Sequence, residues 1–130
     1  MPIRLVLTLM LACVSPGAMA EWTYYGSNND SDLYMDYESI RMDGEIAKMW
    51  FLEDYRGVKK FSYARSFLSA TTLGEYDCKE KRVRTRSFAI HSGKMGGGDV
   101  VFTSKMKMDW EPMVPDSLGE ILWKKACGKK

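Results

Sequence analysis

The chain has 130 residues, with 19 Lys and Arg, 17 Asp and Glu, one His and a formal net charge of +2. This length suits a single small domain with one hydrophobic core. The near-neutral charge argues against a dedicated nucleic-acid-binding protein, since such domains are usually strongly basic.

The first 20 residues have the pattern of a secretory signal peptide. One cation, Arg4, precedes an apolar run from Leu5 to Val14, and Ala18-Met19-Ala20 supplies small residues for a signal peptidase. A membrane span needs about 20 apolar residues, so this shorter run predicts a cleaved signal and not a retained anchor. We therefore expect cleavage after Ala20, a mature domain at 21–130, and a location in the periplasm or at the cell surface.

Lipid anchoring is the alternative to a soluble exported protein. Met10-Leu11-Ala12-Cys13 approaches the signal of a lipoprotein, which ends in a cysteine preceded by small residues. It has Met where Leu or Val is usual, and it would cut the apolar run short. If Cys13 were lipidated, the protein would associate with the outer membrane.

Two cysteines, Cys78 and Cys127, remain after removal of the signal peptide. An even pair in an oxidising compartment predicts a disulfide. A metal site or a redox pair is the alternative, but both usually need close spacing such as Cys-x-x-Cys, which this pair does not have.

The mature chain contains a series of β-prone segments separated by turn residues. Asp43-Gly44 is a strong hairpin signal, and Gly74 suggests a bulge within a long strand. The segments at 37–40, 56–60 and 93–99 are expected to be turns or loops. The predicted strands are 22–25, 33–36, 45–55, 63–78, 81–91 and 100–108.

A single helix is predicted at the C-terminus, from Leu118 to Cys127. Asp116 or Ser117 can cap its first turn, and Glu120 completes a capping-box pattern with Ser117. The predicted fold class is therefore α+β: an antiparallel sheet of about five to six strands, with one C-terminal helix packed on it and tied by a disulfide. Exposed sheet edges also make a homodimer possible.

The order of these residues resembles the surface-adhesin protein E family of bacterial exported proteins, over nearly the whole mature chain. The residues that carry the resemblance are Tyr34, Asp36, Ser39, Ile40, Gly44, Trp50, Leu52, Asp54, Tyr55, Ser66, Tyr76 to Lys79, Arg84, Trp110, Pro115, Ser117 and Cys127. The resemblance implies an antiparallel sheet with a C-terminal helix held by a disulfide. It also implies adhesion, because founding members are outer-membrane lipoproteins that bind vitronectin, laminin and plasminogen. The poor lipoprotein signal is a departure from that pattern.

We expect no enzymatic activity and no cofactor. His91 is the one histidine, so any Ser-His-Asp or Cys-His site would have to use it, and both mature cysteines are assigned to the disulfide. The glycine-rich segment at 93–99 does not have the order of a phosphate-binding loop and opens onto a strand.

Copper binding is an alternative function. Met106 and Met108 lie two residues apart near Trp110, and thioethers suit Cu(I), with His91 as a further ligand across a hairpin. Alternating Lys and Met at 105–108 is equally typical of a half-buried strand with no metal.

The basic stretch at 79–86 is the main candidate for partner binding. Lys81, Arg82, Arg84 and Arg86 could contact an acidic protein or another anionic surface. Strand alternation places the three arginines on one face with Phe88 and Ile90, in the same parity as Cys78, and so on the face that meets the helix. Part of this ladder is expected to pair with acids, with Arg84 the first candidate for a structural role.

Overall fold

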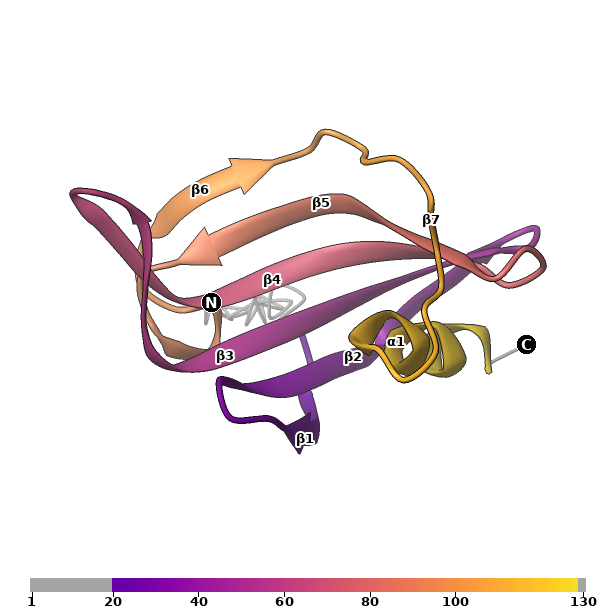
Figure 1. Cartoon of the computed structure of the whole chain (residues 1–130), viewed down its shortest axis with the longest axis horizontal. Coiled ribbons are helices and arrows are strands. Elements are labelled where there is room, and N and C mark those ends of the chain that lie inside the picture. Colours follow the sequence, from indigo (N-terminus) through magenta and orange to yellow (C-terminus); the bar gives the residue numbers. More distant parts are fainter. Residues whose placement is uncertain (1–19, 129–130) are drawn as a thin grey trace, which may run out of the picture.

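The computed structural model describes residues 20–128, and its main element is one twisted antiparallel sheet (Figure 1). The predicted signal peptide and Cys13 lie outside these residues, apart from Ala20. The strands run in the order β1-β2-β3-β4-β5-β6, and β7 pairs with β5. Their bounds are β1 Thr23–Ser27, β2 Ser31–Asp43, β3 Ile46–Ser62, β4 Arg65–Asp77, β5 Arg82–His91, β6 Val100–Ser104 and β7 Glu111–Pro112.

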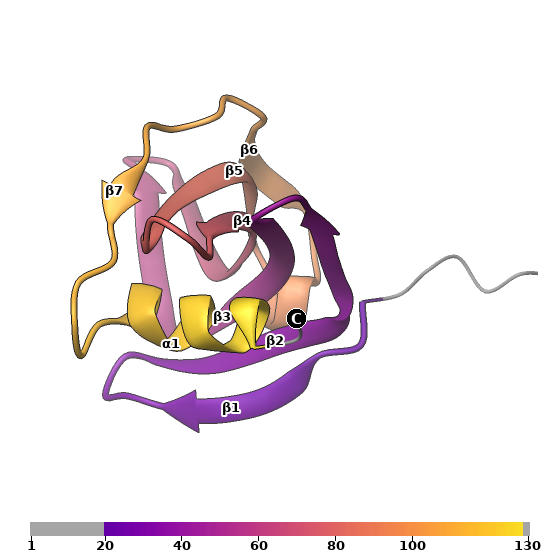
Figure 2. The same cartoon turned by 90° about the vertical axis from the view of Figure 1, so that its right-hand side faces the viewer.

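The C-terminal helix α1, Leu118–Cys127, lies across one end of the sheet (Figures 1 and 2). It begins as predicted, with the Ser117 side chain accepting a hydrogen bond from the Glu120 amide. The predicted disulfide is confirmed: Cys78 and Cys127 are bonded, with their Cα atoms 5.6 Å apart. Within residues 20–128, no helix is long and apolar enough to cross a membrane.

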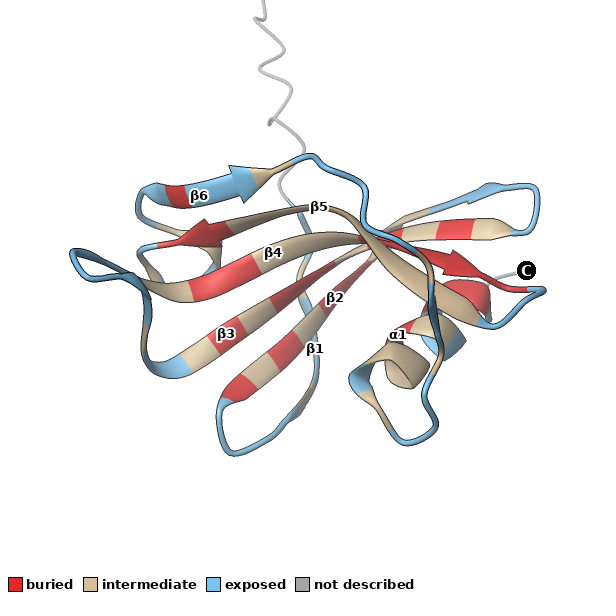
Figure 3. Cartoon of the chain, turned by 45° about the horizontal axis from the view of Figure 1, so that its top comes forward, coloured by how far each residue is buried: buried red, intermediate tan, exposed pale blue. Residues whose placement is uncertain are grey.

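The face of the sheet that α1 covers, here called the helix face, carries the main hydrophobic core. Met35, Met49 and Tyr76 are almost completely buried there and pack with Leu122 and Ala126 of α1. Figure 3 shows the buried residues in the first halves of β2 and β3 and from Ser69 to the end of β4, with the hairpin tips exposed. α1 buries its apolar side against this face, and the disulfide joins the end of α1 to the residue after β4. Both the core contacts and the disulfide therefore hold α1 at the same end of the sheet.

The opposite face, here called the far face, is polar but also substantially buried. The loop after β5, with its short 3-10 helix η1 at Lys94–Gly96, covers one part of it. The Gly96 amide donates to Ser69 Oγ over 2.9 Å, and Lys94 Nζ lies 3.2 Å from Asp54 Oδ2. Ser69 and Asp54 are therefore buried with partners, as buried polar groups require.

The strands differ from the predicted ones in their bounds and in their number. Residues 37–40, expected to be a turn, lie within β2 as an irregularity in its pairing, and 56–60, expected to be a loop, lie within β3. The strand expected at 100–108 ends at Ser104. The two-residue β7 brings the sheet to seven strands, one or two more than predicted.

Candidate functional site

The basic stretch forms a ladder of ion pairs with the acids of β4. Arg82 Nε donates to Asp77 Oδ2 over 2.9 Å, and Arg84 Nη2 donates to Glu75 Oε2 over 3.1 Å. Arg86 Nε lies 3.6 Å from Glu75 Oε1. The two carboxylates are nearly fully buried, so most of the positive charge of the ladder is balanced within the domain.

This ladder lies on the far face, which corrects the predicted position under the helix. Arg82 pairs directly with Asp77 and Arg84 with Glu75, and directly opposed residues share a face. Tyr76 and Val83 pair with each other at the position between these two pairs. Their side chains point to the helix face and belong to the core beneath α1. The parity count from Cys78 was wrong because a turn separates that residue from β5.

A β-bulge explains why the arginines do not share a face with Phe88 and Ile90. Thr85 pairs with Gly74 and Ser87 with Leu73, so Arg86 is an extra residue on β5. The predicted irregularity near Gly74 is confirmed, but the inserted residue is on the neighbouring strand. One inserted residue reverses the alternation beyond it, which moves Phe88 and Ile90 to the helix face.

The turn between β4 and β5 is organised by Asp77. The amides of Glu80 and Lys79 donate to its Oδ1, over 3.0 and 3.1 Å. The hydrogen bond from the Glu80 amide, with further support from Arg82 and Lys79, lowers the pKa of the Asp77 carboxyl. Lys81 occupies the left-handed region with φ of 51° and is exposed at the tip of this turn.

Trp110 covers the outer part of the ladder. β7 pairs its two residues with Arg82 and Val83, which brings the preceding Trp110 beside β5. The centre of the indole ring lies 4.0 Å from Arg84 Cζ and 4.8 Å from Arg82 Cζ, within the range of cation–π contacts. A shallow cavity of about 460 Å³ opens between Lys81, Arg82 and Trp110. No local pattern in the sequence indicates that Trp110 returns to this strand.

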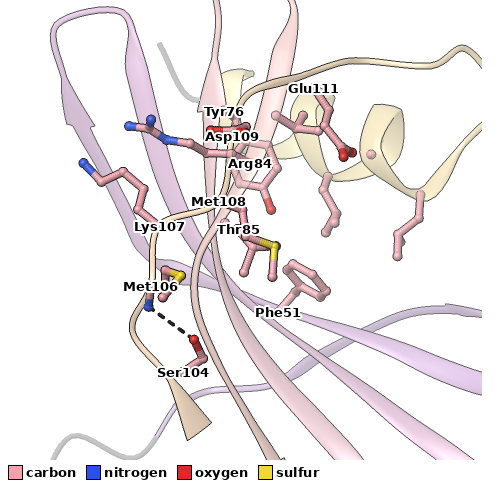
Figure 4. A pocket seen from close by; sticks show the side chains of 15 residues that line it. Phe51, Tyr76, Arg84, Thr85, Ser104, Met106, Lys107, Met108, Asp109 and Glu111 are labelled. Atoms are coloured by element: carbon pink, nitrogen blue, oxygen red, sulfur yellow. Dashed lines mark hydrogen bonds between the residues drawn. The ribbon is translucent and has the colours of Figure 1, made fainter.

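A second cavity, of about 720 Å³, lies on the helix face between β5, the segment 104–111 and α1 (Figure 4). Phe51 and Tyr76 of the sheet and Leu118 of the helix line it. Met106 and Met108 stand at its edge and are 78% and 49% exposed. Burial raises the pKa of Tyr76, so its phenolic oxygen keeps its proton up to strongly alkaline pH.

The structure does not bring the proposed copper ligands together. The His91 ring lies 2.8 Å from Thr71 Oγ1, and burial lowers its pKa. The Met108 amide donates to the carbonyl of Thr85, six residues from His91 along β5, which corresponds to about 20 Å. Met106 and Met108 lie on an irregular segment and not on one strand face. Within residues 20–128, no cluster of three or more His, Cys, Asp and Glu is placed to hold a metal ion.

Comparison with known proteins identifies the family. The family model for Surface-adhesin protein E matches residues 22–128. Crystal form II of Haemophilus influenzae protein E has a TM-score of 0.62 at 16% identity, covering 75% of this chain and 80% of that one. Protein E from non-typeable Haemophilus influenzae has a TM-score of 0.60 at 16% identity, covering 88% and 82%. These similarities show the shared fold, and no curated protein sequence matches. Because the family model spans nearly all the described residues, this chain belongs to the Surface-adhesin protein E family.

Proposed function

We propose that this protein is an exported, cell-surface binding protein that recognises an extracellular partner protein of the host, such as a matrix or serum protein. Membership of a surface-adhesin family supports export and binding in place of catalysis. The predicted signal peptide agrees with export. Cleavage after Ala20 and lipid attachment at Cys13 stay predictions, as does pairing of two copies along the sheet edges.

The contact surface that we propose consists of Lys81, Arg82, Met106, Met108 and Trp110, here called the Trp110 surface. It combines residue types that are enriched at protein interfaces: an indole, a guanidinium and two thioethers. The observation that carries the proposal is the exposure of Met106 and Met108 on the segment that leads to Trp110, whose indole contacts Arg82 and Arg84. Thioether side chains adapt their shape to a partner. An indole that is already held in place provides contact area and loses little conformational entropy on binding.

Exposed lysines of this region can attract acidic side chains of a partner. Lys81 lies in the turn before β5, and Lys105 and Lys107 lie in the segment before Trp110, with the exposed acids Glu80, Asp109 and Glu111 among them. Arg84 and Arg86 are instead occupied by Glu75. Exposed cations accelerate the encounter with an acidic protein, and salt screens this attraction within about 10 Å at 0.1 M. Partner binding is therefore expected to be salt-dependent through the lysines and not through the arginine ladder.

The test measures binding of the exported protein to immobilised vitronectin, laminin and plasminogen. The variant K81N/M106E changes two exposed side chains, and Asn tolerates the left-handed conformation of residue 81. The matched control K60N/V58E makes equivalent changes, Lys to Asn and an exposed apolar residue to Glu, in β3 on another part of the surface. We expect the first variant to weaken binding at least tenfold and the control to leave it unchanged. Equal affinities for both variants, or no binding by the unmodified protein, would overturn the proposal.

A further inference from the structure

Two tryptophans and an aspartate form a row across three neighbouring strands on the far face. Asp36 of β2 pairs directly with Trp50 of β3. The β1–β2 ladder places Thr23 opposite Met35, so Trp22, one residue before Thr23, lies at the position opposite Asp36. Residues directly opposite each other point to the same side of a sheet. The carboxylate therefore lies between two indoles.

The row forms the floor of a cavity of about 760 Å³, which Trp22, Asp36 and Trp50 line together with Glu21, Glu38 and Arg41. This volume is within the usual range for small-molecule sites. Three carboxylates face one guanidinium, although the whole chain has a net charge of +2. Arg41 Nη1 donates to the backbone carbonyls of Glu38 and Ile40, each over 2.8 Å.

Asp36 is the one buried acid of this cavity, with 7% of its surface exposed. Its Oδ1 is buried and accepts no hydrogen bond from any described residue. Leaving a buried carboxylate oxygen without a donor is costly, so such a group indicates a position that a ligand can complete. Glu75, Asp77 and Asp54, the other buried acids of the far face, all have a cationic partner.

The backbone around Asp36 is fixed. Ser39 Oγ donates to the carbonyl of Asp36 over 2.6 Å and accepts a hydrogen bond from the amide of Trp50 over 2.9 Å. This bridge holds the irregular part of β2 against β3, in the place where regular pairing is interrupted. The backbone segments that carry the Asp36 carboxylate and the Trp50 indole are therefore held together.

We propose that Trp22, Asp36 and Trp50 bind the alkylated ammonium group of a small organic cation. Neighbouring strands are about 4.8 Å apart, so side chains two strands apart are separated by about 9.6 Å. An ammonium group midway lies about 5 Å from each indole, within the 6 Å reach of a cation–π contact, with the carboxylate beneath it. A metal ion fits less well, because Ca²⁺ and Mg²⁺ require several converging oxygen ligands, and within residues 20–128 no three acids are placed to hold one ion.

The first test compares choline with 3,3-dimethylbutan-1-ol, which has the same shape without the charge. Both are titrated into the exported, processed protein, and the four tryptophan indole N–H signals are followed by NMR. We expect choline to shift the signals of Trp22 and Trp50, to leave that of Trp110 in place, and to bind at least tenfold more tightly than the alcohol. Equal binding of the two molecules, or shifts confined to Trp110, would overturn the proposal.

Variants then test the individual roles. Asp36→Asn removes the charge at constant shape and is expected to weaken choline binding at least tenfold without affecting the alcohol. Trp22→Leu removes a half-buried indole from the cavity and is expected to weaken choline binding severalfold. It keeps the proposal testable if Asp36→Asn does not fold. Trp110→Phe is the control and is expected to bind choline normally. If the α-ammonium of a processed N-terminus at Glu21 fills the cavity, choline produces no shift, and the proposal is wrong.

Discussion

The guanidinium of Arg84 donates a 3.1 Å hydrogen bond to Glu75, whose side chain is only 5% exposed. We expect Arg84→Leu to reduce the free energy of unfolding by about 3 kcal/mol, because it leaves a buried carboxylate without its closest cation. The loss is measured by urea denaturation at neutral pH.

Arg86→Leu is the matched control for this change. Arg86 lies 3.6 Å from the same carboxylate, but 40% of its side chain is exposed, so the expected cost is below about 1 kcal/mol. If the two variants lost the same stability, Arg84 would not have the structural role that its burial and its contact with Trp110 indicate. Changing Arg82, Arg84 and Arg86 together to Ser is likewise expected to destabilise the fold, because it leaves the buried Glu75 and Asp77 without cations.

Gly74 is expected to be required because the Tyr76 ring occupies the space of its missing side chain. A Cβ on residue 74 would lie 2.2 Å from the Tyr76 hydroxyl, so Gly74→Ala should cost about 2 kcal/mol. Gly57→Ala, in β3, has no atom within 4 Å of the new Cβ and should change stability by less than about 0.5 kcal/mol. Both values are measured by chemical denaturation.

Tyr76→Phe provides a further check on this contact. The Tyr76 hydroxyl is buried and has no hydrogen-bond partner among the described residues, so its removal is expected to be neutral or stabilising. It should also reduce the cost of Gly74→Ala, since the closest contact disappears. An unchanged cost of Gly74→Ala in both backgrounds would show that the two residues are not coupled.

The Cys78–Cys127 bond is expected to contribute about 4 kcal/mol to stability, because it closes a loop with a sequence separation of 49 residues. The double variant C78A/C127A, compared with the oxidised protein in urea, measures this contribution. The unmodified protein treated with a reductant is the control, and it should unfold at a urea concentration similar to that of the double variant. A loss below about 1 kcal/mol would mean that packing alone holds α1 on the sheet.

His91 is expected to make stability depend on pH near neutrality. Burial lowers the pKa of His91 in the folded state, whereas the unfolded chain titrates near pH 6.5. As the pH falls, the unfolded state therefore binds a proton at His91 before the folded state does. The stability that neutral His91 contributes is fully present above pH 6.5, and it is lost as the pH falls from there through the lowered pKa. Urea denaturation between pH 5 and 8 should show a steeper fall for the unmodified protein than for His91→Gln. Parallel curves would exclude His91 as the cause.

The features that the sequence predicted correctly are those with local chemical causes. Asp43-Gly44 forms the expected hairpin turn, with Gly44 at φ of 59°, and Ser117 caps α1 through its own hydroxyl. The disulfide followed from the number of cysteines and the expected compartment. At the other end of α1, Gly128 is the C-cap, and its amide donates to the Lys124 carbonyl.

The errors arose where distant strands overrode local preference. Residues 56–60 are polar and include a glycine, yet β3 continues through them, because Lys59 and Lys60 pair with Phe67 and Ser66 of β4. The alternating Lys and Met residues after Ser104 have a strand-like pattern, but they leave the sheet and return only at β7. Pairing between segments far apart in the chain has no local signature.

The candidate sites were predictable to different degrees. The composition of the stretch around Arg84 identified the ladder. The turn after Cys78 decided its face, a one-residue bulge separated it from Phe88 and Ile90, and strand alternation shows neither. The row of Trp22, Asp36 and Trp50 depends on the register of two strand pairs, so no spacing within the sequence indicates it.

The link between Cys78 and Cys127 also determines how the domain carries mechanical load. Tension applied between residue 20 and residue 128 follows the chain to Cys78, crosses the sulfur–sulfur bond and leaves at Cys127. Residues 79–126, which include β5 and Trp110, lie outside this covalent path and cannot be drawn out by the pull. In a protein that attaches to a surface under flow, the segment that carries the Trp110 surface would thus not be extended, even when β1 to β4 are under tension.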